Sequence, residues 1–218
     1  MTPSVQTQPL VLQGVHHSYN EAEVLHGIDL TLHKGELAAL LGPSGSGKTT
    51  LLAIAGGLLR PTSGEVSILG TPMTGRLTEI ARKVAYILQA GSLIPYLTVA
   101  ENLHARRIVA GLKPDRARAA ELLEAVDLTR KAGRYPDKLS GGERQRACVA
   151  QALYTGAPVL LADEPTASLD RSRGRAVMTL LAAHAHDTGA AVLVATHDER
   201  SLDLTDRTLS IEDGLLRS

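Results

Sequence analysis

Residues 42–49 read GPSGSGKT, a complete match to the phosphate-loop pattern of Gly, any four residues, Gly-Lys and Ser or Thr. The loop follows a short apolar run, ELAALL at 36–41, and opens a stretch typical of a helix, KTTLLAIAGGLL at 48–59. A strand, a glycine-rich turn and a helix in this order aim free backbone N–H groups and the positive end of the helix at one spot. The stretch therefore predicts an α/β core that binds the phosphates of a nucleotide.

Each residue type in this loop has a chemical reason. Gly42, Gly45 and Gly47 let the backbone wrap phosphates, because a Cβ atom would block the approach. Lys48 is expected to reach the β- and γ-phosphates, and the Thr49 hydroxyl is expected to ligate Mg²⁺. The rest of the predicted nucleotide-binding loop consists of Pro43, Ser44, Ser46 and Thr50. A chance glycine-rich turn is the alternative, and the flanking strand and helix argue against it.

Two carboxylates end a second apolar run, VLLADEP at 159–165. The carboxyl end of a strand beside a phosphate loop is where a doubly wound sheet places its ligand. Asp163 is expected to hold Mg²⁺ through water, and Glu164 to polarise the water that attacks the γ-phosphate. The alternative, that one of the two merely caps the next helix, loses weight once the phosphate loop is considered.

A histidine follows a third apolar run, AAVLVAT at 190–196. From the end of that strand, His197 is able to contact the γ-phosphate. The alternative is a surface histidine at the start of a helix, with Asp198 as the helix cap. These residues alone favour the surface histidine.

The periodicity of the remaining chain indicates its organisation. Alternating polar and apolar residues over 11–32 predict antiparallel strands, and the run at 83–88 predicts another buried strand. From about 90 to 154, apolar residues recur at three- and four-residue spacing, which predicts an inserted helical subdomain. We expect one domain, 1–218, with an α/β P-loop NTPase core, a mostly parallel sheet and an N-terminal antiparallel β subdomain.

Composition excludes several classes of protein. Lys plus Arg equals Asp plus Glu at 23 each, so no overall basic field favours nucleic acid as a partner. The single cysteine, Cys148, allows no internal disulfide and no zinc knuckle, and its apolar neighbours predict a buried thiol. The start, MTPSVQTQPL, does not have the pattern of a secretion signal, and no window of about 18 residues is wholly apolar. These features predict a cytoplasmic chain.

A second glycine-rich stretch, LSGGERQR at 139–146, precedes another predicted helix and raises the question of why one chain needs a second anion site. Read in order, GPSGSGKT, Gln89 after a strand, LSGGERQR, VLLADEP, ASLD at 167–170 and His197 form a specific series. The series covers the chain from about Leu10 and resembles the ATP-binding subunits of ABC transporters. The LSGG element is the most discriminating, because most P-loop NTPases lack it.

The resemblance implies ATP and Mg²⁺ as ligands and assigns further roles. Tyr19 is implied to stack on adenine, and Gln89 to contact the metal and report the state of the γ-phosphate. Asp170 is implied to lie in a loop that crosses between protomers, and His197 to be the switch histidine. The expected catalytic residues are Lys48, Glu164 and His197, and the expected metal ligands are Thr49, Gln89 and Asp163.

Two partners are implied as well. The family works as a head-to-tail dimer in which Ser140, Gly141 and Gly142 of one copy grip the ATP bound by the other, which would explain the second anion site. A transmembrane permease subunit would place the chain on the inner face of the cell membrane. The apolar stretch 89–105 is expected to line a groove for that subunit, with internal packing as the alternative.

Within the family, the sequences at 95–103 and 206–218 resemble the lipoprotein-releasing and macrolide-exporter group, and also the cell-division group. Two departures stand out. Gln151 stands where the family usually has Arg, and ASLD replaces the G-N-L-D that is common in the lipoprotein-releasing and macrolide-exporter group. The alternative function is a soluble ABC-type ATPase in DNA maintenance or translation. Such DNA-maintenance ATPases carry a long coiled coil or zinc motifs, and the translation factors carry two cassettes, whereas this chain has one cassette and no heptads.

Overall fold

The computed structural model describes residues 8–73, 77–89 and 91–217. Its centre is a six-stranded sheet in the order β10-β9-β3-β8-β7-β6, parallel except for the β9–β10 pair. The strands are β3 (Leu37–Leu41), β6 (Val84–Ile87), β7 (Val159–Asp163), β8 (Ala191–Thr196), β9 (Arg207–Glu212) and β10 (Leu215–Arg217). The predicted mostly parallel sheet is confirmed.

Both faces of this sheet are covered at β3, β7 and β8, which explains why these three strands are continuous apolar runs. In β7, Leu160 and Ala162 belong to one buried cluster, and Val159 and Leu161 belong to the other. Successive side chains of a strand point to opposite faces, so β3, β6, β7 and β8 each supply both cores. The carboxyl ends of β3, β7 and β8 meet at one edge, where functional residues of an α/β sheet gather.

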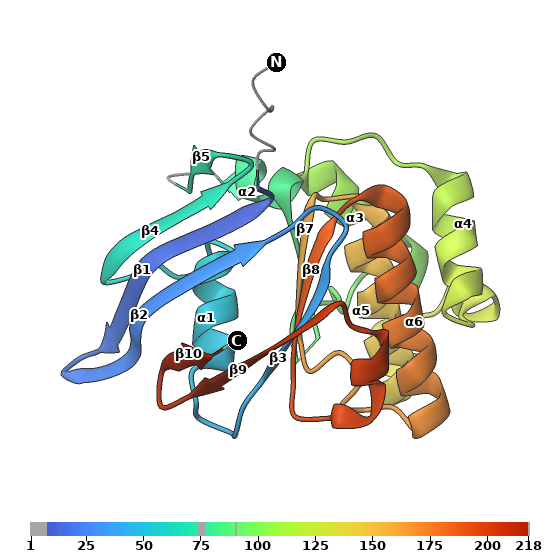
Figure 1. Ribbon diagram of the computed structural model, residues 1–218. Helices are drawn as coiled ribbons and strands as arrows, with labels where there is room; N and C mark the ends of the chain where they lie inside the picture. Colours follow the sequence, from blue (N-terminus) through green and yellow to red (C-terminus); the bar gives the residue numbers. More distant parts are fainter. Residues whose placement is uncertain (1–7, 74–76, 90, 218) are drawn as a thin grey trace, which may run out of the picture.

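A second, antiparallel sheet contains the N-terminal strands, as predicted, and lies beside the central sheet (Figure 1). Its order is β2-β1-β4-β5, formed by Ala22–Leu32, Leu10–Tyr19, Ser63–Ile68 and Thr71–Pro72. Helix α1 (Lys48–Ala55) packs in the core that this sheet shares with the central one. The helix is shorter than the stretch 48–59 typical of a helix, because its C-cap is Gly56, the first residue of a Gly-Gly pair.

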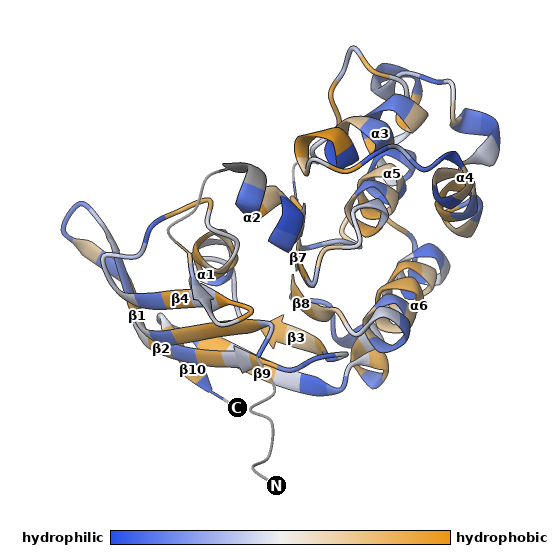
Figure 2. Cartoon of the chain, turned by 90° about the horizontal axis from the view of Figure 1, so that it is seen from above, coloured by the Kyte–Doolittle hydropathy of each residue, from blue (hydrophilic) through white to orange (hydrophobic). Residues whose placement is uncertain are grey.

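Three helices group on the opposite side of the chain from the antiparallel sheet (Figure 2). They are α3 (Val99–Val109), α4 (Arg116–Ala125) and α5 (Gly141–Tyr154), with short 3-10 turns at Thr129–Lys131 and Pro136–Lys138. This confirms the predicted helical region. Cys148 of α5 is buried within it, as predicted, and burial raises the pKa of its thiol.

Other helical segments complete the chain. Helix α6 (Arg171–Thr188) packs against α5 and the central sheet, and the 3-10 segment Glu199–Leu204 follows β8. Helix α2 (Leu77–Lys83) was not predicted from the sequence. The strand predicted at 83–88 is correspondingly shorter, because Lys83 closes α2 and β6 begins at Val84.

Two buried amides tie the segment after Gln89 to the helices. The Asn102 side chain of α3 is fully buried, accepts from the N–H of Ile94 and donates to the carbonyls of Ile94, Leu97 and Thr98. Gln151 of α5 accepts from the Ser92 hydroxyl at 2.9 Å and donates to the Asn102 carbonyl at 3.2 Å. Residues 92–98 are therefore held as one body with α3 and α5.

Across the residues that the structure describes, no helix combines the length and the apolar character needed to span a bilayer.

Candidate nucleotide site

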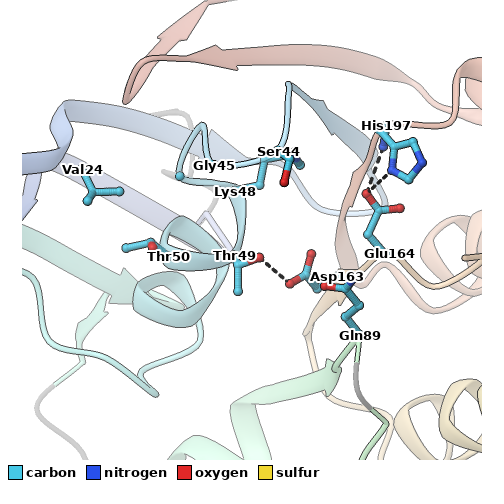
Figure 3. Close-up of a pocket in the computed structure, with 11 residues that line it drawn as sticks. Val24, Ser44, Gly45, Lys48, Thr49, Thr50, Gln89, Asp163, Glu164 and His197 are labelled. Atoms are coloured by element: carbon cyan, nitrogen blue, oxygen red, sulfur yellow. Dashed lines mark hydrogen bonds and ion pairs between the residues drawn. The ribbon is translucent and has the colours of Figure 1, made fainter. Parts of the chain in front are cut away.

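One cavity of about 520 Å³ lies at the carboxyl edge of the central sheet (Figure 3). The phosphate loop, the start of α1 and the ends of β6, β7 and β8 meet there. Its lining consists of Val24, Ser44, Gly45, Gly47, Lys48, Thr49, Thr50, Gln89, Asp163, Glu164 and His197. Residues that are 153 positions apart in the sequence, from Ser44 to His197, thus line one site, as the motif series predicts.

The phosphate loop is shaped by its glycines and by its lysine. Gly47 has a φ of +102°, and a Cβ atom there would lie 2.8 Å from Leu25, so both the backbone and the space require glycine. Lys48 is buried, and its Nζ donates to the carbonyls of Gly42 and Pro43 at 2.7 and 2.8 Å. The lysine thereby closes the loop on itself and holds its ammonium group at the cavity wall.

A hydroxyl and a carboxylate face each other at the floor of the cavity. Thr49 Oγ1 donates to Asp163 Oδ2 at 2.7 Å. Burial raises the pKa of Asp163, while the hydrogen bond from Thr49 opposes the rise. The Gln89 side chain lines the same cavity (Figure 3). Three oxygen-bearing side chains therefore converge here, the donor type that Mg²⁺ prefers.

Glu164 is held in one orientation by three donors. It is 8% exposed and accepts from the His197 N–H at 3.1 Å and from Thr196 Oγ1 at 3.3 Å, and His197 Nδ1 lies 2.7 Å from the same carboxylate. Its φ of +49° is uncommon for a residue with a side chain. Strained backbone of this kind costs about 1–3 kcal/mol and clusters at functional sites.

The structure shows features of both interpretations of His197. Its side chain is 74% exposed, and Asp198 caps the 3-10 segment Glu199–Leu204 by accepting from the Arg200 N–H at 3.0 Å. The same imidazole contacts Glu164 at the cavity (Figure 3). By contrast, neither Asp163 nor Glu164 caps the helix that follows β7, because Asp170 is the N-cap of α6.

The second glycine-rich stretch lines a different cavity, of about 250 Å³. Ser140 is the N-cap of α5, and it forms a capping box with Glu143. A Cβ atom on Gly142 would lie 3.1 Å from Leu169, so glycine lets the ASLD segment approach. This second cavity is lined in part by Ser140, Gly142 and Asp170, and Gly141 is the first residue of α5. None of these four residues lines the nucleotide cavity.

Tyr19 ends β1 with half of its surface exposed and does not line the nucleotide cavity. Gly42, Pro43 and Ser46 belong to the phosphate loop but also lie outside the lining. Sequence reasoning missed two residues of the site: Val24, which lines the cavity, and Thr196, which orients Glu164. The position of Thr196 between an apolar run and His197 was the available signal for the second.

Comparison with known proteins agrees with this geometry. The family described as ABC transporter matches residues 25–167. The lipoprotein-releasing system ATP-binding protein LolD of Alcanivorax borkumensis is 39% identical over 225 residues, which cover 99% of this chain and 97% of that protein. The chain belongs to the ABC transporter family. The putative hemin import ATP-binding protein HrtA of Staphylococcus haemolyticus is 38% identical, covering 89% of this chain and 90% of that protein.

Solved structures place the fold in the same family. The dimeric structure of MJ0796, a bacterial ABC transporter cassette, has a TM-score of 0.88 and 33% identity, covering 96% of this chain and 97% of that one. A dimeric post-hydrolysis state of the same cassette holds ADP and phosphate. As an ABC transporter ATP-binding subunit, the chain binds and hydrolyses ATP to drive transport across a membrane together with a transmembrane partner.

Proposed function

We propose that ATP hydrolysis in this chain uses Glu164 to orient and polarise the attacking water. The observation that carries the proposal is the buried carboxylate fixed by Thr196 and His197 at the wall of the cavity that Lys48 lines. A general base must be held at the reacting centre by its own partners. His197 positions that carboxylate, and its exposed imidazole edge is available to the γ-phosphate.

The loop residues bind rather than react. Backbone N–H groups of 44–50 at the start of α1 hold the phosphates, and Lys48 moves from the Gly42 and Pro43 carbonyls to the β- and γ-phosphates. The oxygens of Thr49 and Asp163, with the side chain of Gln89, would hold Mg²⁺. When bound, Mg²⁺ neutralises negative charge on the β- and γ-phosphates.

The partner in this chemistry is a second copy of the chain. Ser140 and Asp170 line a cavity that shares no residue with the nucleotide cavity, which supports a role toward another molecule's ATP. A two-fold dimer would bring the start of α5 onto the partner's phosphate loop, each subunit offering the same surface. The dimeric state of the related cassette MJ0796 supports this arrangement.

The membrane partner is a permease subunit that docks on the segment following Gln89. Tyr96 is 86% exposed and Ile94 is 45% exposed, so both are free to contact another protein. Leu93 is partly buried against the helical core, which supports internal packing for that residue. Ala90, part of the predicted stretch, lies outside the described residues.

Together these features support one ATP-binding domain over 1–218 with a helical insertion over about 90–154, attached to the inner face of the cell membrane through its permease. We place it in the lipoprotein-releasing and macrolide-exporter group, since the Alcanivorax relative is named for lipoprotein release. The predicted domain includes residues 1–7 and 218, which lie outside the described residues. Residues 1–7 are also most of the N-terminal segment that does not have the pattern of a secretion signal.

The test is Glu164→Gln in the purified chain. ATP affinity should stay near that of the unmodified protein, because Lys48 and Thr49 are intact, while phosphate release should slow by about 100-fold or more. Glu124→Gln, a substitution of the same type at an exposed position on α4, is the control. Phosphate release within a few-fold of normal would remove Glu164 from the role of base.

A further inference from the structure

His17 is a buried histidine that the nucleotide chemistry does not use. It lies in β1, two residues before Tyr19, and is 7% exposed. Neither of its ring nitrogens has a hydrogen-bond partner among the described residues. The closest aromatic contact is with Tyr19, whose ring centroid lies 4.7 Å away with the two planes at 83°.

An unpaired buried imidazole is unfavourable. A buried polar group without a partner destabilises a protein, because it loses its hydrogen bonds to water and gains none in return. An aliphatic side chain would fill the same space without that cost. The contact with Tyr19 is a reason for a planar ring here, because perpendicular aromatic rings at this separation attract each other edge to face.

The position of His17 connects it to the phosphate loop. His17 pairs with Leu25 across the β1–β2 ladder, and Leu25 packs where Gly47 allows no Cβ atom. The next residue toward the hairpin, Val24, lines the nucleotide cavity. The Tyr19 ring, half exposed, is thus anchored on the strand pair that borders the site.

We propose that His17 is a positioning residue that fixes the plane of the Tyr19 ring, so that its free surface is ready to stack on the purine base. This inference rests on the adenine-stacking role that the family resemblance implies for Tyr19. The imidazole acts through its ring contact and makes no bond to the nucleotide. It sets affinity for the base and leaves the grip on the phosphates unchanged.

The experiment compares two ligands of the purified full-length chain, ATP and inorganic tripolyphosphate, which has no base. His17→Ala should weaken ATP binding about three- to tenfold and raise KM to the same extent, with kcat and tripolyphosphate affinity unchanged. His17→Phe keeps a ring edge and removes the unpaired nitrogens, so it should restore ATP affinity. The matched control is His16→Ala, since His16 is half-exposed and contacts Glu23 instead.

Each result decides the proposal. Equal loss of ATP and tripolyphosphate binding in His17→Ala would show a general structural role and overturn it. Failure of His17→Phe to restore affinity would mean that a nitrogen contact matters, which also overturns it. Tyr19→Ala should weaken ATP binding by at least about fivefold. If Tyr19→Ala weakens ATP binding and His17→Ala does not, the positioning role of His17 fails and the stacking role of Tyr19 stands. If Tyr19→Ala leaves ATP affinity unchanged, the stacking role of Tyr19 fails, and the positioning role of His17 fails with it.

Discussion

Replacing Asn102 should be among the most damaging single substitutions outside the nucleotide cavity. The side chain is fully buried and makes four contacts of 2.7–3.1 Å to the backbone of residues 94–98. The Nδ2 atom carries two protons, so its three contacts with carbonyl oxygens amount to two hydrogen bonds. The Oδ1 atom accepts a third hydrogen bond from the Ile94 N–H. At about 1 kcal/mol each, Asn102→Ala should lower the free energy of unfolding by about 2–4 kcal/mol.

Urea denaturation followed by far-UV circular dichroism measures this loss in the free energy of unfolding directly. For a chain of 218 residues, the melting temperature should fall by about 5–15 °C. Asn102→Asp should be worse than Asn102→Ala, because a carboxylate oxygen would replace the donor that faces three carbonyl oxygens. Asn20→Gly is the control, since Asn20 is exposed at a φ of +54°, which glycine tolerates.

Two results would refute this reasoning. A loss below about 0.5 kcal/mol for Asn102→Ala would mean that water or rearranged backbone replaces the amide. An Asn102→Asp variant more stable than Asn102→Ala would mean that the donors do not face the carbonyls as described.

Three further expectations concern the site and its partners. Lys48→Ala and Ser140→Arg chains should each fail as homodimers, while their mixture should retain labelled ATP in a dimer-sized species; no retention despite confirmed heterodimers would end the shared-site proposal. Tyr96→Glu should abolish co-purification with the permease at unchanged thermal stability, and unchanged co-purification would move the interface elsewhere. Because burial raises the pKa of Asp163 above its ordinary 3.8, its ionisation destabilises the fold. Asp163→Asn should therefore be more stable than the native chain at neutral pH, with the difference in unfolding free energy closing as pH falls from the raised native pKa toward 3.8, and a constant difference across pH would contradict this.

Sequence reasoning predicted which motif residues meet at one edge of the sheet, because the nucleotide motifs are local. A strand, a glycine turn and a helix in GPSGSGKT, and apolar runs ending in Asp163 or preceding His197, each specify where one strand ends. Parallel strands end at a common edge, so the residues meet without further information. The contact of His197 with Glu164, and the φ of Glu164, depend on packing between strands and could not be read from either motif.

The misses have physical causes as well. Helix α2 has seven residues, too few for a periodic signal. The role of Leu93 was ambiguous, since an apolar residue in a loop has the same sequence signature whether it faces a core or a partner. Only burial separates Leu93 from Tyr96.

The strand order of the central sheet has a consequence for the synthesis of the protein on the ribosome. Strand β3, which ends where the phosphate loop begins, pairs only with β8 and β9 among the described strands. At roughly 5–20 residues per second, a ribosome needs about 8–30 s to travel from Leu41 to Ala191. For that time the apolar strand Leu37–Leu41 has neither neighbour and presents open edges to other nascent chains. A chain interrupted before residue 191 would carry every residue of GPSGSGKT without either of the strands that pair with β3.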